Sequence, residues 1–160
     1  MYVEDFSCVA EKSKILVKEK GKKFFTYKTV SKIAKLLADE GELYTLDCNI
    51  ELNRITKIEY IGVQEFYEIK TFSGGLIHIG KDTDIFVDGV WIPMYELLFH
   101  EKIYLYDILD DTFRNTYVTS IELYKNLRAV KIYAEKEDGI VVNNFMIRFF
   151  DSVETVAPIP

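Results

Sequence analysis

The feature that most constrains the fold is a long series of short apolar runs separated by turn residues, which extends over most of the 160-residue chain. Gly74-Gly75 and Asp88-Gly89 are strong turn signals, and the second lies between Val87 and Val90, as in a two-residue hairpin. Candidate strands lie at 14–18, 24–27, 43–46, 55–61, 65–72, 76–79, 85–87, 91–92, 102–106, 116–124 and 129–135. A long final stretch, 139–150, carries the end of the fold. The pattern predicts a mainly β protein.

One segment departs from this pattern. Between Val30 and Leu37 the apolar residues recur at helical spacing, with Thr29 or Ser31 as a possible N-cap and Gly41 as a stop. After it the helical period does not clearly return. So many strands with a single short helix predict a closed, curled β architecture in one domain.

Composition excludes several classes of function. The net charge of −6 argues against broad nucleic-acid binding, which needs a basic surface. The chain has two cysteines, no Cys-x-x-Cys and no His-x-x-x-His, so neither a disulfide framework nor a structural zinc site is expected. No apolar run approaches the roughly 20 residues that span a bilayer, and Glu4 and Asp5 do not fit a signal peptide. We therefore expect a cytoplasmic monomer with reduced thiols.

The two ends of the pattern carry reactive groups. Cys8 directly precedes the run that starts at Val9, and Val141-Val142-Asn143-Asn144 lies near the other end. A thiolate can attack the preceding carbonyl, and an asparagine side chain can attack its own carbonyl. A thiol and an asparagine so placed would let a chain break its own backbone twice.

Read from Cys8, the chain resembles the hedgehog/intein (Hint) family, and in particular an intein without an embedded endonuclease. The resemblance rests on segments in the expected order: 8–17, the helix at 29–40, 56–58 with 65–70, 75–84, Asp88-Gly89-Val90-Trp91 and Tyr95-Glu96-Leu97. It implies a horseshoe-like β fold with one short helix that brings both chain ends into one site. It also implies an N-terminal flanking segment at 1–7, an intein-like domain at 8–144 and a C-terminal flanking segment at 145–160.

In that resemblance Cys8 attacks the carbonyl of Ser7 and converts the amide to a thioester. Asn144 then cyclises to a succinimide and releases Phe145. The substrates and partners are the chain's own flanking segments in cis, and no cofactor or metal is needed. Autocatalytic cleavage or splicing is the implied activity.

The assisting residues depart from the family pattern. Inteins usually carry Thr-x-x-His in the second motif, where this chain has Gly80 and Thr83; His78, on the same strand face as Gly80, is a conceivable substitute. Asn143 stands where inteins usually have the penultimate His, and Phe145 replaces the usual Cys, Ser or Thr acceptor. Because each acid–base group contributes about 10²–10⁴-fold, the expected activity is impaired, slow cleavage rather than efficient ligation.

A second register stays open. The segment 143–150 could be the closing strand, with Phe149-Phe150 at the His-Asn positions, and no terminal asparagine nucleophile would then exist. The chain would be a catalytically dead Hint domain that serves as an insertion or a protein-binding module. In that case Cys8 is a buried thiol, Asn143-Asn144 is a turn, and His78 is structural.

Two further patterns are weaker. The flanks at 1–5 and 149–153 resemble the segments around the Walker B acids of a phage large terminase, which would make the protein phage-encoded, in the host cytoplasm. Asp107, Asp110 and Asp111 resemble a metal cluster only superficially, and a solvated loop is the favoured account of them.

Overall fold

The computed structural model describes residues 7–97 and 102–149, and the two flanks that resemble a terminase lie almost entirely outside these ranges. In order along the chain, the elements are β1 (Val9–Ala10), β2 (Lys14–Glu19), β3 (Thr26–Thr29), α1 (Val30–Ala38), β4 (Leu43–Leu46), β5 (Leu52–Thr71), β6 (Leu76–Ile79), β7 (Asp84–Val87), β8 (Val90–Pro93), the 3-10 helix η1 (Met94–Glu96), β9 (Lys102–Asp107), β10 (Thr112–Ala134), β11 (Ile140–Val142) and β12 (Phe145–Arg148).

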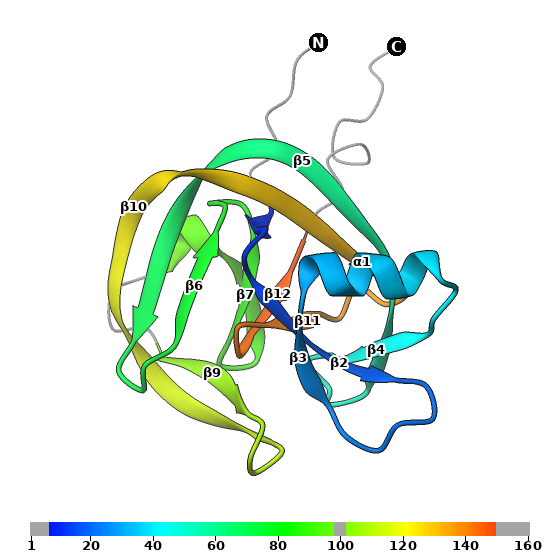
Figure 1. Cartoon of the computed structure of the whole chain (residues 1–160). Coiled ribbons are helices and arrows are strands. Elements are labelled where there is room, and N and C mark those ends of the chain that lie inside the picture. Colours follow the sequence, from blue (N-terminus) through cyan, green and yellow to red (C-terminus); the bar gives the residue numbers. More distant parts are fainter. Residues whose placement is uncertain (1–6, 98–101, 150–160) are drawn as a thin grey trace, which may run out of the picture.

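The strands form one continuous antiparallel sheet that curls on itself. Its order is β11-β2-β4-β5-β6-β1-β10-β9-β12-β7-β8, with β3 on β2. Additional pairings of β11 with β12 and of β5 with β10 connect parts of the sheet that are distant along this path. In Figure 1 the result is a ring of strands, with β5 and β10 arching over its top and β11 and β12 near its centre. The predicted mainly β, horseshoe-like architecture with one short helix is confirmed.

Two very long strands, β5 and β10, pair along most of their length and arch over the molecule (Figure 1). Each spans two strands that the sequence pattern separates: 55–61 and 65–72 are one strand, as are 116–124 and 129–135. Gly62 falls in the first of these gaps, with a φ of 85° and a register shift opposite it. A bulge there bends the ribbon without ending it.

Helix α1 begins and ends close to the predicted positions. Thr29 is the N-cap, and its side chain accepts a hydrogen bond from the amide of Lys32. The amide of Gly41 bonds to the carbonyl of Leu36 at 2.8 Å, which closes the last turn. Val30 and Ile33 bury the inner face of the helix. In the part of the chain that the structure describes, no helix is long and apolar enough to cross a membrane.

The predicted turn at Asp88-Gly89 joins β7 to β8 in a two-residue hairpin, with positive φ at both residues. The candidate strands at 14–18 and 24–27 correspond to β2 and β3, with the second displaced along the chain. Strand β2 pairs with Thr26–Thr29, so Phe24 lies outside the ladder and is largely exposed.

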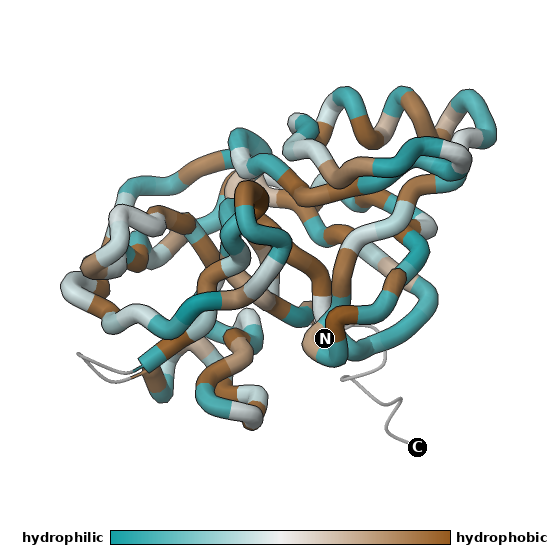
Figure 2. Tube along the Cα trace, turned by 90° about the horizontal axis from the view of Figure 1, so that it is seen from below, coloured by the Kyte–Doolittle hydropathy of each residue, from teal (hydrophilic) through white to brown (hydrophobic). Residues whose placement is uncertain are grey.

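The apolar side chains gather in one large core and two smaller clusters. The large core draws on most strands and on α1, and includes Val9, Ile33, Ile69, Val130 and Ile147. Hydrophobic and hydrophilic residues alternate along much of the chain trace, as Figure 2 shows. A separate cluster on the other side of β1 contains Cys8, Ala10, Phe66 and Ala129.

Candidate active site at the two ends of the domain

The peptide group before Cys8 is held by its neighbours across the sheet. The amide of Cys8 donates to Oγ1 of Thr83 at 3.0 Å, and the same hydroxyl donates to the carbonyl oxygen of Cys8 at 3.0 Å. The amide of Gly80 bonds to that carbonyl at 2.9 Å. Thus the two positions that align with the second intein motif both contact the backbone of Cys8.

Thr83 itself is rigidly placed. Its amide bonds to the carbonyl of Gly80 at 3.1 Å, its own carbonyl accepts from the amide of Met94 at 2.8 Å, and the residue is fully buried. The hydroxyl of this buried threonine contacts both the amide and the carbonyl of Cys8. That hydroxyl accepts a hydrogen bond from the nitrogen of the peptide bond between Ser7 and Cys8. Ser7 is buried as well.

The side chain of Cys8 is fully buried and belongs to a small hydrophobic cluster. Cys8 has an exposed fraction of 0% and packs with Ala10, Phe66 and Ala129. Burial among apolar side chains disfavours a thiolate. A nucleophilic role therefore requires a compensating donor or positive charge close to the sulfur.

Lys131 is a residue at this site that the sequence pattern did not single out. Val9 pairs with Val130 and Ala10 with Ala129, so one step further along the ladder Lys131 lies opposite Cys8. Val130 and Ile132 point into the large core, so alternation places Lys131 on the face that carries Cys8 and Ala129. Lys131 has an exposed fraction of 0%, which is rare for a lysine. A lone Lys between Val130 and Ile132 was the available signal, but its partner could not be read from the sequence.

His78 lies on the neighbouring strand β6, one step away from Cys8 along the ladder. Val9 pairs with Ile79, which places His78 opposite Ala10 and Gly80 opposite Cys8. Its Nε2 lies 2.9 Å from a carboxylate oxygen of Glu68. Burial lowers the pKa of His78, and the hydrogen bond from His78 lowers the pKa of Glu68. Near neutral pH the pair is a neutral imidazole donating to a carboxylate, packed on the ring of Tyr124.

Asn143 and Asn144 form the tip of a hairpin. Val142 pairs with Phe145 across them, and both asparagines have positive φ, 48° and 75°. This is the two-residue turn geometry that asparagine tolerates. Phe145, predicted as the residue released at the junction, is the first residue of β12 and is fully buried.

Both asparagines are held by contacts remote from Cys8. Oδ1 of Asn143 accepts from the amide of Lys14 at 2.8 Å, and its Nδ2 donates to the carbonyl of Leu76 at 3.2 Å. Tyr27 donates to Oδ1 of Asn144, and burial raises the pKa of this phenol.

The other end of β12 lies on the Cys8 side. Arg148 donates from Nε and Nη2 to one carboxylate oxygen of Asp84, at 3.1 and 2.7 Å, and Asp84 directly follows Thr83. Arg148 lies four residue steps beyond Asn144 along an extended strand, which is roughly 13 Å. The structure therefore brings Cys8 and Thr83 together with the far end of β12, and it does not bring Asn144 to them.

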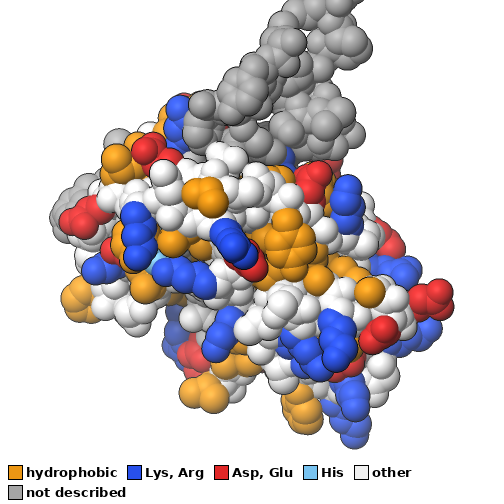
Figure 3. All heavy atoms as spheres, turned by 45° about the horizontal axis from the view of Figure 1, so that its top comes forward, with side chains coloured by type: hydrophobic (Ala, Val, Ile, Leu, Met, Phe, Trp, Pro, Cys, Tyr) orange, Lys and Arg blue, Asp and Glu red, His pale blue; other side chains and the backbone are white. Residues whose placement is uncertain are grey.

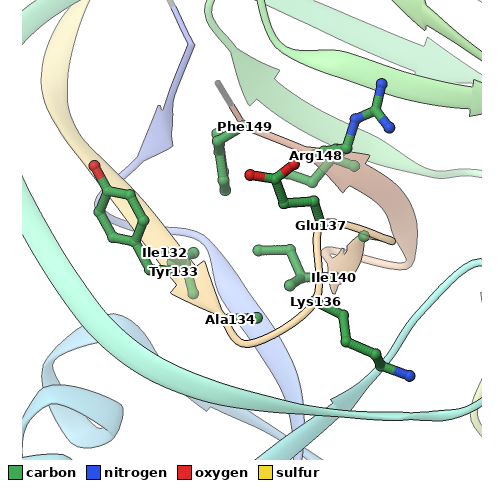
Figure 4. Close-up of a pocket in the computed structure, with 10 residues that line it drawn as sticks. Ile132, Tyr133, Ala134, Lys136, Glu137, Ile140, Arg148 and Phe149 are labelled. Atoms are coloured by element: carbon green, nitrogen blue, oxygen red, sulfur yellow. The ribbon is translucent and has the colours of Figure 1, made fainter. Parts of the chain in front are cut away.

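Phe149 follows β12 and lines a pocket with Ile132 and Tyr133 of β10. Figure 4 shows its ring pointing into this pocket, whereas Arg148 points away. Strand β10 thus contacts both ends of the domain. Val130 pairs with Val9, and residues 132–134 line the pocket together with Phe149. Phe150, the next residue, lies outside the described ranges.

The remaining candidates lie elsewhere. Cys48 is half-buried, and burial raises the pKa of its thiol. Arg114 contacts Asp107 and Asp110, and Tyr106 donates to Asp111, so these acids have protein partners. Within residues 7–97 and 102–149 no cluster of His, Cys, Asp or Glu could hold a metal ion. On the face in Figure 3, basic side chains lie among acidic and hydrophobic ones.

Comparison with known proteins gives structural matches only. No known family profile and no curated protein matches the sequence. The fold matches a DnaB intein from Synechocystis sp. PCC 6803 with a TM-score of 0.72 and 16% identity, covering 90% of this chain and 99% of that one. This is the intein (Hint) fold. A DnaX mini-intein from Spirulina platensis matches at 0.68 with 18% identity, covering 89% and 99% of the two chains. The transcription factor IIB Mvu mini-intein matches at 0.71 with 13% identity, covering 89% and 99%.

Proposed function

We propose that the chain is a self-processing domain whose one reactive junction is the peptide bond between Ser7 and Cys8. The observation that carries the proposal is the pair of 3.0 Å hydrogen bonds between the Thr83 hydroxyl and the backbone of Cys8. They hold a buried peptide bond in a fixed orientation next to a thiol that can attack it. The Hint fold supports the same class of activity.

The reaction is an acyl shift from nitrogen to sulfur. The sulfur of Cys8 attacks the carbonyl carbon of Ser7, the new C–S bond forms, and the C–N bond to Cys8 breaks. The thiol proton is lost and the amide nitrogen gains a proton, so the products are a thioester and a free amine, with no net change in composition. An added thiol or hydroxylamine then attacks the thioester and releases residues 1–7.

Thr83 is the group that acts on the leaving nitrogen. Its Oγ1 accepts the amide hydrogen of Cys8 in the resting structure. Once the carbonyl becomes tetrahedral, the nitrogen becomes basic and can accept a hydrogen bond from the same hydroxyl. A neutral hydroxyl is a weak acid compared with an imidazolium, so this site should be slower than one with histidine at that position.

The C-terminal junction is proposed to lie after β12. Four features support this: the turn geometry of Asn144, the burial of Phe145, the ion pair of Arg148, and the position of Phe149 beside β10. Succinimide formation at Asn144 would cut the chain inside a hairpin. We therefore expect neither release at Phe145 nor ligation of the flanks.

A catalytically dead Hint domain, serving as an inserted binding module, is the second candidate. The observation that favours it is the apolar, fully buried setting of the Cys8 thiol. In this case the Thr83 hydrogen bonds simply anchor β1 to the ring.

Mass spectrometry of the purified chain separates the two. We expect dithiothreitol or hydroxylamine to release residues 1–7 slowly, and Cys8→Ala to abolish that release. The matched control is Cys48→Ala, which removes the other thiol and should cleave like the parent. A parent chain that stays intact for days under both nucleophiles, while remaining folded, would leave only the binding module.

A further inference from the structure

The thiol of Cys8 is fully buried, and a positive charge beside it would favour its action as a nucleophile. Ionising a buried thiol costs free energy unless a cation or several hydrogen-bond donors face the sulfur. His78 does not supply that charge, because burial lowers its pKa and its Nε2 is engaged by Glu68. The other strand that flanks β1 is β10, which carries Lys131.

We propose that Lys131 is the cation that favours the thiolate of Cys8, an inference that rests on the function proposed above. The ladder places the two residues opposite each other on the same face of the sheet, and both have an exposed fraction of 0%. Directly opposed residues of an antiparallel pair have Cβ atoms about 4.5–5.5 Å apart. A charge at that range, away from solvent, acts strongly on a neighbouring ionisation.

Other titratable groups also surround this position. Glu59 of β5 pairs with Lys131 in the long ribbon, and its carboxylate accepts from the hydroxyl of Tyr133 at 2.8 Å. On the β6 side lie His78 and Glu68, and Lys81 and Asp82 lie in the loop before Thr83. An acid facing Lys131 would reduce its effect on the thiol, so the experiment measures the coupling at the thiol itself.

The experiment titrates Cys8 in a Cys48→Ser background labelled with [¹³Cβ]cysteine. The carbon resonance of Cys8 follows ionisation of the thiol by NMR and differs from that of a thioester, so the titration requires no cleavage. In Lys131→Met we expect the apparent pKa of the thiol to rise by about one unit or more. Lys131→Arg keeps the charge and should shift the titration much less.

Lys57→Met is the matched control, because Lys57 lies on the same ribbon, 5.2 Å from the ring centroid of Tyr133, but is exposed. It should leave the titration unchanged. If Lys131→Met does not fold, Lys131→Gln replaces it, as a neutral residue that keeps a hydrogen-bond donor.

An unchanged titration midpoint in a folded neutral variant would overturn the proposal, as would a parent thiol that never ionises while the protein stays folded. If Lys131→Met raises the apparent pKa of the thiol as expected but the parent chain never cleaves, the proposed function is refuted and the Lys131 coupling stands.

Discussion

The two ends of the domain contact two consecutive residues, Thr83 and Asp84, but through different kinds of interaction. At the N-terminal end the hydroxyl of Thr83 contacts the backbone of Cys8, at the peptide bond that would react. At the C-terminal end the carboxylate of Asp84 contacts the side chain of Arg148, which fixes a strand and presents no reactive group. The difference shows that the two ends are held by unlike contacts, one to the backbone at a peptide bond and one to a side chain.

Thr83→Val should have the largest effect, because it removes the hydroxyl at the leaving nitrogen while preserving side-chain shape. We expect thiol-induced release of residues 1–7 to slow by about 100-fold, measured by mass spectrometry over time. Thr83→Ser keeps the hydroxyl and should retain most of the rate. Equal rates in Val and Ser variants would mean that Thr83 has no part in the reaction.

Arg148→Met tests the other end. It leaves the carboxylate of Asp84, which is 3% exposed, without its cation, and we expect a loss of about 1–3 kcal/mol in the free energy of unfolding. Arg148 is partly exposed, which places the effect below that of a fully buried pair. Denaturant unfolding measures it, and the N-terminal cleavage rate should change much less than in Thr83→Val.

The same variant has a defined pH dependence. Burial raises the pKa of Asp84 above its ordinary value and Arg148 opposes that rise, so the folded state holds its proton more tightly than the unfolded state. Stability from this group is therefore lost as pH rises through the window above its ordinary pKa. Arg148→Met should cost less near pH 4 than near pH 7, and a pH-independent loss would exclude Asp84 as its cause.

Asn144→Ala should have a smaller effect on stability. Positive φ costs a residue with a Cβ about 1–2 kcal/mol, and the substitution also removes the hydrogen bond from Tyr27. Asn144→Gly isolates the side-chain contribution, because glycine adopts this φ freely. Neither variant should change the release of residues 1–7. Loss of that release in Asn144→Gly would show that the side chain of Asn144 takes part in the reaction.

His78→Gln should have the smallest effect at neutral pH. Glutamine can still donate to Glu68, so the cost is expected to be below about 1 kcal/mol. Because burial lowers the pKa of His78, the unfolded state binds more protons below about pH 6.5, and the parent loses stability there as pH falls. The variant should lose less between pH 7 and pH 5 in thermal unfolding. An acid sensitivity equal to the parent's would assign the loss to other groups.

Much of the fold follows from local sequence signals. Alternating apolar runs predicted the strands, Thr29 and Gly41 predicted the ends of α1, and Asp88-Gly89 predicted a hairpin, because each is decided by a few neighbouring residues. The sequence pattern divided the long strands of the ribbon in two, because a glycine in a bulge, such as Gly62, cannot be told from a turn glycine by residue type alone.

The site was harder to predict because it depends on register between distant strands. Asparagine is both a turn former and a possible nucleophile, so the sequence left both interpretations of Asn143-Asn144 open, and the pairing of Val142 with Phe145 places the two residues in a turn. Lys131 was missed for the same reason, because only the ladder between β1 and β10 places it opposite Cys8.

Peptide mapping of one thiol-treated sample, covering both ends of the domain, tests the central claim most directly. The account predicts a new C-terminus at Ser7 and an unbroken peptide across Asn144 and Phe145. A C-terminal succinimide at Asn144, with residues 1–7 still attached to Cys8, would contradict it.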